Sequence, residues 1–314
     1  MTGVLNSLVI PVYRNATTIT EVVATVDLIA TRVSGALEAL FVIDGSPDRS
    51  HERLMAALQK AKTPARVITH SRNFGSFAAI RTGMCLARGA RIAVMTADLQ
   101  EPPDLIVEFF NCLARGEAEV VAGERASRDD RGDLASALYW RLYRRFVMRE
   151  VPIGGVDVFG CTAKVRDVVC SLEETHTSLI GQLFWAGFQR EIVRYDRIPH
   201  EEPSGWTFGR RLRYLTDSVF AFTDLPVRIL WGVGITGLIV AVVLGAVVLV
   251  ARIVGTIHVP GYAATVLIVL LFLSINSVGL GIIGSYVWRA YETAKRRPGA
   301  VVRDIIEVGS ERGS

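Results

Sequence analysis

The chain has 314 residues, of which 50% are hydrophobic, and carries a net charge of +4. This length and a positive mean hydropathy predict one large domain plus a segment more apolar than a soluble core. The basic residues gather beside the apolar segments, which favours anionic lipid over nucleic acid as the partner. The first residues have no basic stretch and soon reach a proline, so they are predicted to form a first strand rather than a signal peptide.

Strands and helices are predicted to alternate along the first part of the chain. Apolar runs typical of buried strands lie at residues 8–12, 40–43, 65–69, 92–95 and 119–122. Apolar residues at helical spacing lie between them, at residues 16–32, 50–60, 74–87 and 102–115. This alternation predicts an α/β fold with a mostly parallel, doubly wound sheet.

Polar side chains follow the end of each predicted strand. They are Pro11, Tyr13 and Asn15 after the first strand, Asp44, Gly45, Ser46 and Asp48 after the second, Ser71, Arg72 and Asn73 after the third, Asp98 and Gln100 after the fourth, and Arg125 and Arg128 after the fifth. In doubly wound sheets ligands bind outside the carboxyl ends of the strands. These side chains are therefore expected to converge on one site.

The turn after the fourth strand has the residue types of a cation site. Residues 92–103 read I-A-V-M-T-A-D-L-Q-E-P-P, so an apolar run ends at Asp98 and Gln100 before two prolines open the next helix. Carboxylate and amide oxygens suit Mg²⁺ or Mn²⁺ better than zinc, and substrate phosphates commonly complete the shell of such ions. An aspartate in a solvated turn is the alternative, and the convergence of five strand ends favours the cation site.

Beyond Arg128 the alternating pattern changes. Residues 134–148 are a predicted helix with aromatic and basic residues, which fits either packing close to a membrane or a core helix with a solvated face. Asp157 lies among apolar and glycine residues at 153–161. A carboxylate in such surroundings is either functional or a helix cap, and both readings stay open.

The four cysteines are predicted to be reduced core residues. Cys85, Cys112, Cys161 and Cys170 show neither a C-x-x-C pair nor metal-ligand spacing. A cytoplasmic domain keeps its thiols reduced, and a free cysteine behaves as a small apolar side chain.

Two segments near the C-terminus are predicted to be membrane helices. Residues 229–251 and 262–288 contain no charged residue, and each can cross a hydrocarbon core of about 30 Å as a helix. Basic residues precede the first segment and follow the second, so both termini are expected to be cytoplasmic. The predicted organisation is an α/β domain at 1–203, an amphipathic juxtamembrane segment at 204–228, spans at 229–251 and 262–288 joined by an external loop at 252–261, and a cytoplasmic tail at 289–314.

Two weaker patterns concern the C-terminal part. Ser277, Gly281 and Ser285 recur every four residues in the second span, which fits close helix contact within a homo-oligomer or a chance arrangement. Residues 301–308 alternate weakly between apolar and polar, which indicates a short strand that returns to the domain.

With these residues in place, the chain resembles the polyprenyl-phosphate glycosyltransferases of glycosyltransferase family 2. Their catalytic domain has the GT-A type, a Rossmann-like fold, and they include dolichyl-phosphate mannose synthase and the bactoprenol glucosyltransferases. The motifs that carry the resemblance are V-I-P-V-Y-R-N at 9–15, I-D-G-S-P-D at 43–48, S-R-N-F-G at 71–75, T-A-D-L-Q-E-P-P at 96–103 and N-S-V-G-L-G-I-I-G-S-Y-V-W-R at 276–289. Their order and spacing, with the two spans, cover nearly the whole chain.

The resemblance implies a membrane-bound, inverting and metal-dependent hexosyltransferase. It would move a sugar from a nucleotide diphosphate, UDP-glucose by default, to polyprenyl phosphate at the cytoplasmic face of the inner (plasma) membrane. The family's motifs place Mg²⁺ or Mn²⁺ on Asp98 and Gln100. The implied catalytic residues are Asp157, Asp98 and Arg125, and the implied donor-binding residues are Pro11, Tyr13, Asp44, Ser46, Asn73 and Arg128.

Three positions depart from the family's motifs. Ile43 replaces the first aspartate of the nucleotide turn, and Thr96 replaces the first aspartate of the metal motif. Gly160 stands where a D-F-R element has its arginine. These changes leave open a second reading, an inactive membrane-anchored relative that binds nucleotide or acts as a scaffold. A processive polysaccharide synthase is a third reading, and the chain lacks the Q-x-x-R-W motif of that class.

Overall fold

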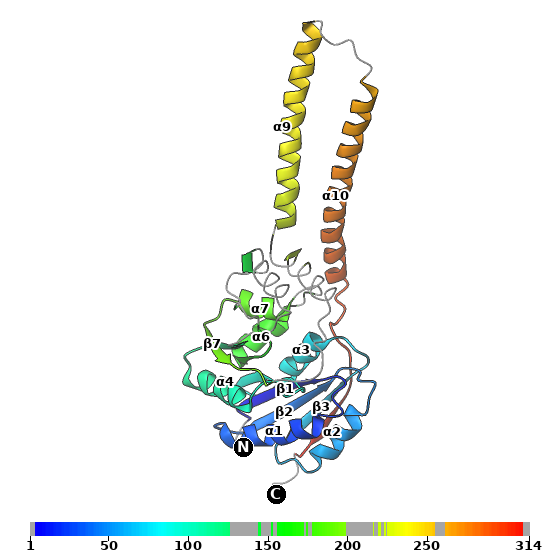
Figure 1. Cartoon of the computed structure of the whole chain (residues 1–314). Helices are drawn as coiled ribbons and strands as arrows, with labels where there is room; N and C mark the ends of the chain where they lie inside the picture. The colour runs from blue at the N-terminus through cyan, green and yellow to red at the C-terminus, as the bar shows by residue number, and fades with distance from the viewer. Residues whose placement is uncertain are drawn as a thin grey trace.

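A computed structural model describes most of the catalytic domain and both apolar helices. The described residues are 4–125, 144–145, 152, 156–172, 174, 178–198, 216, 219–220, 223, 225–254 and 261–309. Figure 1 shows a layered α/β body from which two long helices, α9 and α10, project side by side.

The body is built on one mixed sheet of eight strands in the order β7-β5-β6-β4-β1-β2-β3-β8. The strands are β1 Asn6–Val12, β2 Leu37–Ile43, β3 Ala65–His70, β4 Arg91–Val94, β5 Val120–Arg125, β6 Phe159–Thr162, β7 Arg190–Tyr195 and β8 Val302–Val308. β1 pairs in parallel with β2 and β4, and β3 continues the parallel set beyond β2. β6 runs antiparallel between β4 and β5, and β8 runs antiparallel to β3. The expected α/β fold with a mostly parallel sheet is confirmed.

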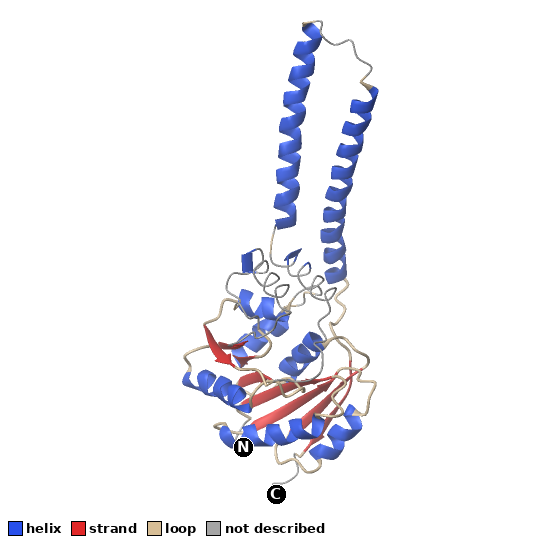
Figure 2. Ribbon diagram, viewed as in Figure 1, coloured by secondary structure: helices blue, strands red, loops and turns tan. Residues whose placement is uncertain are grey.

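Helices cover both faces of the sheet, as Figure 2 shows. Their bounds are α1 Ile19–Arg32, α2 Ser50–Leu58, α3 Ser76–Leu86, α4 Pro103–Arg115, α6 Ala163–Ser171 and α7 Leu179–Trp185. Successive side chains of β1 point to opposite faces, so Leu8 and Ile10 pack in the core under α1, α2 and α4. Val9 packs in the second core, under α3, α6 and α7. Burial on both faces explains why these strands are continuous apolar runs.

The segments α6, α7, β6 and β7 were not foreseen from the sequence. β6 is a four-residue strand that lies between β4 and β5 and runs antiparallel to both, and it is too short to show a local period. The predicted helix at 134–148 lies outside the described residues, apart from 144–145. The amphipathic segment at 204–228 is described only at 216, 219–220, 223 and from 225 onward, where α9 begins.

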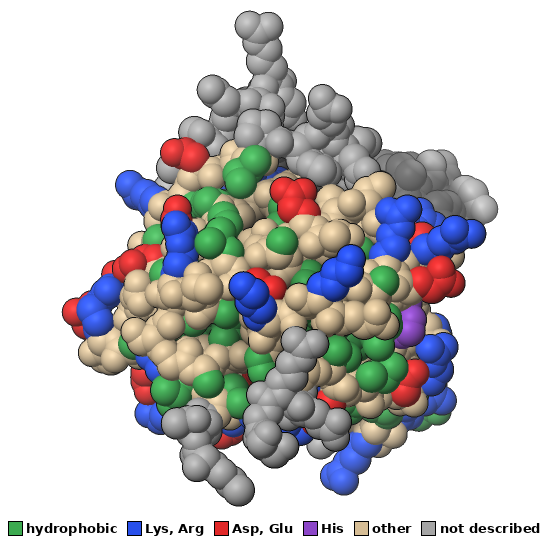
Figure 3. Space-filling view, turned by 90° about the horizontal axis from the view of Figure 1, so that it is seen from below, with side chains coloured by type: hydrophobic (Ala, Val, Ile, Leu, Met, Phe, Trp, Pro, Cys, Tyr) green, Lys and Arg blue, Asp and Glu red, His purple; other side chains and the backbone are tan. Residues whose placement is uncertain are grey.

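The two C-terminal helices are longer than the predicted spans. α9 runs over Leu225–Ile253 and α10 over Tyr262–Ala294. Within them, Leu225–Leu244 and Leu271–Ala294 are long and apolar enough to cross a membrane, by length and composition. Seen from the opposite end, the sheet domain carries acidic and basic side chains spread over its face (Figure 3). The large exposed apolar side chains of α9 and α10 therefore contrast with a charged domain surface.

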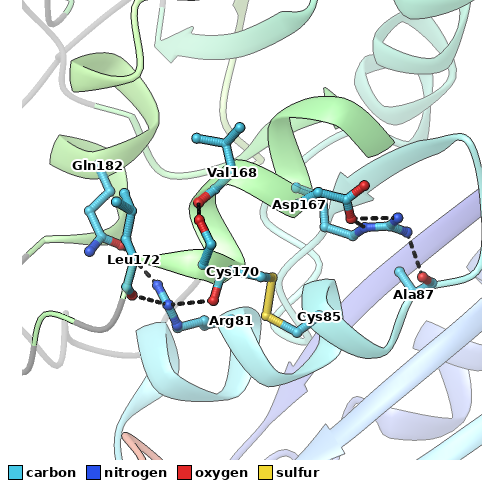
Figure 4. The surroundings of a disulfide bond; sticks show 10 residues. Arg81, Cys85, Ala87, Asp167, Val168, Cys170, Leu172 and Gln182 are labelled. Carbon is cyan, nitrogen blue, oxygen red and sulfur yellow. Dashed lines mark hydrogen bonds and ion pairs between the residues drawn. A yellow bond between two sulfur atoms is a disulfide. The ribbon is translucent and has the colours of Figure 1, made fainter. Parts of the chain in front are cut away.

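The prediction for two of the cysteines was wrong. Cys85 near the end of α3 and Cys170 near the end of α6 form a disulfide, with their Cα atoms 5.8 Å apart (Figure 4). The tertiary contact of α3 with α6 brings together two residues that are 85 positions apart, and sequence spacing carries no sign of it. Cys112 and Cys161, also within the described ranges, are free and buried, as expected.

Candidate active site

The turn between β4 and α4 collects several oxygen donors in a few residues. Leu99 has a positive φ of 57°, an unusual conformation for a leucine that reverses the chain between Asp98 and Gln100. The Thr96 hydroxyl contacts Asp98 Oδ1 and also Glu101 Oε2. The Gln100 backbone N–H donates to Asp98 Oδ1 over 3.3 Å. The turn thus holds Asp98 in place through its own residues.

The residues just beyond β7 also reach this turn. The Ile198 N–H, just beyond β7, donates to the Gln100 carbonyl over 3.0 Å. Arg197 lies beside Asp98, with 3.9 Å between Nη2 and Oδ2. Among the described residues, Gln100 Oε1 is buried without a hydrogen-bond partner. A buried amide oxygen in that state is an available acceptor, which suits a cation or a donor hydroxyl.

Glu101 is a buried acid at this turn, with 3% of its surface exposed. Its pKa is raised to about 7: burial is the largest cause, the hydrogen bonds from Thr96 oppose it, and the charges of Asp98 and Asp157 add to it. No role was predicted for Glu101 from the sequence, because the family's metal motif accepts any residue type at that position. Its burial next to Asp98 is visible only in three dimensions.

Asp157 and Arg125 meet across the sheet. Arg125 ends β5, Asp157 precedes β6, and their side chains form an ion pair of 2.7 Å between Nη2 and Oδ2. Burial alone would lower the pKa of Arg125, but the interactions with Asp157 and Tyr195 together outweigh it and the pKa is raised, so the guanidinium stays charged. Asp157 acts on the pKa of Glu101, which places it at the same site as the β4–α4 turn. A side chain at Gly160 would be crowded, since a Cβ there would lie 3.3 Å from the Ile92 carbonyl oxygen and equally close to side-chain atoms of Leu113 and Phe109.

Asp44 forms the centre of the turns after β2 and β3. It is 2% exposed and accepts hydrogen bonds from the N–H groups of Phe74 and Gly75, at 2.8 and 2.7 Å. His70 Nδ1 lies 2.9 Å from Asp44 Oδ1, and His70 Nε2 lies 3.0 Å from the Thr82 hydroxyl. The carboxylate therefore shapes the S-R-N-F-G loop, and its expected contact with the donor's base or ribose stays a prediction.

Gly45 allows that loop to lie close to the second turn. Its φ is +59°, and a Cβ added there would lie 2.4 Å from the backbone of Arg72 and Asn73. Asn73 is thereby held against the turn that carries Ser46. Sequence reasoning had assigned both residues to the donor site.

The first and second turns are also joined by hydrogen bonds. The Arg14 N–H donates to Ser46 Oγ over 2.8 Å, and the Ser46 hydroxyl donates to Asp48 Oδ1 over 2.6 Å. Tyr13 is exposed beside them, and Pro11 lies within β1. The Asn15 side-chain amide donates to the Ala97 carbonyl over 3.3 Å and so connects the first turn to the acidic turn.

The structure thus brings Pro11, Tyr13, Asp44, Ser46, Asn73, Asp98, Gln100, Arg125 and Asp157 to one edge of the sheet. Arg128 lies outside the described residues. Sequence reasoning missed Glu101, Arg197 and His70. His70 could have been found from the sequence, because it is the last residue of β3, which was predicted as a strand. Arg197 could not, because it follows β7, which was not predicted.

The residues fit a magnesium or manganese ion only as part of a larger shell. In the described part of the chain, no group of three or more His, Cys, Asp or Glu side chains is arranged to hold a metal. Asp98 and the unpartnered Gln100 Oε1 are nevertheless hard oxygen donors in one turn. Such a pair fits an ion that takes most of its ligands from a bound diphosphate.

The model of glycosyl transferase family 2 matches residues 7–171, which contain all of these turns. The chain belongs to this family. A similar curated relative is the uncharacterized glycosyltransferase YkcC of Bacillus subtilis, 31% identical over 98% of this chain and 95% of the relative. The undecaprenyl-phosphate 4-deoxy-4-formamido-L-arabinose transferase of Pseudomonas aeruginosa is 29% identical over 96% of this chain and 90% of the relative. The protein is therefore a glycosyltransferase with homology to polyprenyl-phosphate sugar transferases.

Solved structures of similar fold are more distant. Glucosyl-3-phosphoglycerate synthase of Mycobacterium tuberculosis, in complex with Mn²⁺, UDP-glucose and phosphoglyceric acid, is 17% identical, with a TM-score of 0.47 over 64% of this chain and 73% of that chain.

Proposed function

We propose that this glycosyltransferase moves a sugar from a nucleotide diphosphate donor, UDP-glucose by default, to polyprenyl phosphate at a membrane surface. The observation that carries the proposal is that one chain joins an acidic turn on a GT-A type sheet to two exposed apolar helices. A homologue whose name specifies undecaprenyl phosphate supports the acceptor class, because its similarity extends over both parts of this chain. The sugar itself is left to experiment.

The path of the chain supports a two-span arrangement. The chain leaves the domain at α9 and returns through α10 to β8, which pairs with β3 of the same sheet. A chain that crosses the membrane twice can follow this path. The start of α9 and the end of α10, which both face the domain, then lie on the same side of the membrane. We place that side in the cytoplasm of the inner (plasma) membrane, because Arg289, Lys295 and Arg297 follow the second span. The Cys85–Cys170 disulfide is then an exception to the reduced thiols that are usual in that compartment. A homo-oligomer formed through the Ser277, Gly281 and Ser285 stripe is part of the same proposal.

The reaction needs charge stabilisation more than base catalysis. A phosphate monoester has a second pKa of about 6 and is largely dianionic at pH 7, so it attacks with little help from a base. Arg125, held by Asp157, would neutralise charge on the donor diphosphate or the lipid phosphate. Asp157 would orient the acceptor or the sugar. A single displacement would invert the anomeric centre.

A divalent ion would bind at Asp98 and Gln100. When bound, Mg²⁺ or Mn²⁺ would neutralise the diphosphate as the glycosyl bond breaks. Asp98 is held for that role by the Gln100 N–H and the Thr96 hydroxyl. Arg197 would balance the charge of Asp98 on its other oxygen.

The test is Asp98→Asn in the full-length protein, purified in detergent or nanodiscs. Transfer from a panel of labelled nucleotide sugars to polyprenyl phosphate is expected to fall by about 100-fold or more, the effect typical of losing one electrostatic group at a reacting centre. Asp104→Asn is the matched control, since Asp104 is an exposed carboxylate of α4 with 80% of its side chain accessible. Full activity in Asp98→Asn would refute the metal role.

The second candidate is an inactive relative that binds nucleotide or acts as a scaffold, favoured by Ile43 and Thr96. Isothermal titration with UDP-sugars and Mg²⁺ separates the two. A catalytic protein binds donor at millimolar concentration or below and turns it over. Binding without turnover across the panel would favour the nucleotide-binding reading, and no binding at millimolar donor would favour the scaffold.

A further inference from the structure

Glu101 differs from the other acids of the site in its depth. The side chains of Asp98 and Asp157 are 34% and 42% exposed, whereas Glu101 is 3% exposed. A buried carboxyl group costs free energy unless it is hydrogen-bonded or paired with positive charge. The burial of Glu101 at the acidic turn therefore calls for a structural or functional explanation.

The Thr96 hydroxyl connects Glu101 to Asp98. It contacts Glu101 Oε2 on one side and Asp98 Oδ1 on the other, and the Thr96 N–H lies 3.4 Å from Glu101 Oε2. A hydroxyl has one proton, so it can donate to only one of two carboxylate oxygens. When both carboxyl groups are ionised, the three groups therefore have one acceptor too many, which either a proton on Glu101 or additional positive charge at Asp98 relieves.

Thr96 occupies the position where the acidic turn of this fold class was expected to carry an aspartate. Glu101 is the acid whose Oε2 contacts the Thr96 hydroxyl. A carboxyl group five residues along the chain from position 96 thus contacts the hydroxyl at that position and, through it, Asp98.

We infer that Glu101 supports the cation site in place of the aspartate absent at position 96, by positioning Asp98 through the Thr96 hydroxyl. This inference rests on the proposed function. Glu101 is a positioning residue, because Thr96 stands between it and Asp98. Groups behind a metal ligand commonly change metal affinity by about 10–100-fold.

A purely structural role would make a different prediction. Glu101 lies two residues before α4, where negative charge favours the start of a helix. Its loss would then lower thermal stability without changing the affinity for a divalent ion. Metal affinity and thermal stability therefore have to be measured on the same samples.

The experiment compares Mn²⁺ affinity in the presence of UDP, followed by electron paramagnetic resonance of free Mn²⁺. Glu101→Gln is expected to weaken Mn²⁺ binding at least about tenfold. The double variant Thr96→Asp with Glu101→Gln moves the carboxylate back to position 96 and is expected to regain most of the affinity. Glu108→Gln is the control and keeps wild-type affinity, since Glu108 is a partly exposed glutamate of α4 that pairs with Arg115.

Two outcomes would overturn the inference: unchanged Mn²⁺ affinity in Glu101→Gln, or a folded double variant that does not regain affinity. If Glu101→Gln does not fold, Thr96→Val removes the hydroxyl link at similar volume, and unchanged affinity there overturns the inference equally. Wild-type protein that binds neither UDP nor Mn²⁺ would refute the proposed function as well. If the wild type binds UDP and Mn²⁺ and Glu101→Gln binds Mn²⁺ equally well, only the inference is refuted.

Discussion

The Asp44 carboxylate accepts hydrogen bonds from two backbone N–H groups of the loop after β3 and contacts His70. Asp44→Asn replaces one acceptor oxygen by an N–H₂ group that faces these donors. Loss of a buried acceptor of this kind costs about 1–3 kcal/mol. We expect a lower melting temperature and weaker donor binding in Asp44→Asn, measured by calorimetry and titration, while Asp167→Asn on the surface of α6 leaves both unchanged. Wild-type stability in Asp44→Asn would contradict this expectation.

The pH dependence of stability follows from the same contacts. Burial would raise the pKa of Asp44, but the hydrogen bonds from His70, Phe74 and Gly75 outweigh it and hold the pKa below the ordinary 3.8. A folded-state pKa below the unfolded value stabilises the protein above the unfolded pKa, and this stabilisation is lost as pH falls through the folded value. Melting temperatures measured from pH 7 to pH 3 should therefore fall less steeply below pH 4 in Asp44→Asn than in the wild type. Parallel curves would show that Asp44 does not contribute.

The residues of the site differ in how far the sequence revealed them. Asp98, Gln100 and Arg125 follow strands with clear apolar runs, and the carboxyl ends of those strands meet at one edge. Glu101 lies in the same turn, yet its burial depends on side-chain directions that no sequence period encodes. Arg197 was missed because it follows β7, which is only partly buried and starts with charged residues.

At the scale of elements, the disulfide fastens α3 to α6. Arg81 of α3 strengthens the same contact by donating to the carbonyl oxygens of Cys170 and Leu172 (Figure 4). In the chain-entropy model a bond that closes a loop of 85 residues stabilises by about 4–5 kcal/mol at most. We expect reductant to lower the melting temperature of the wild type, and Cys85→Ser to show the lower value with or without reductant. A wild-type melting temperature that is the same with and without reductant would contradict this expectation.

The elements that sequence predicted well are those with a local period. β8 was expected from weak alternation at 301–308, and it pairs with β3 over Val302–Val308. β6 has four residues, includes Gly160 and joins β4 to β5 in an antiparallel sense. Such an insertion is decided by tertiary packing, so it escapes prediction from periodicity.

At the scale of the whole molecule, β8 restricts how the chain can cross a membrane. The strand follows α10 and pairs with β3 inside the domain sheet, so the domain and β8 must lie on the same side. The segment between α9 and α10, which includes Thr256, must then lie on the other side if both helices cross. One crossing would leave β8 separated from β3.

This arrangement predicts the labelling pattern of single cysteines in intact cells. Thr256→Cys, placed between α9 and α10, should react with a membrane-impermeant maleimide, whereas Gly299→Cys, between α10 and β8, should react only after the membrane is opened. The wild type is the control, since its cysteines are buried or paired in the disulfide. Reaction of both variants in intact cells, or of neither, would refute the two-span arrangement. Reaction of Gly299→Cys alone would keep two crossings but place the catalytic domain outside, where a cytoplasmic nucleotide sugar could not reach it.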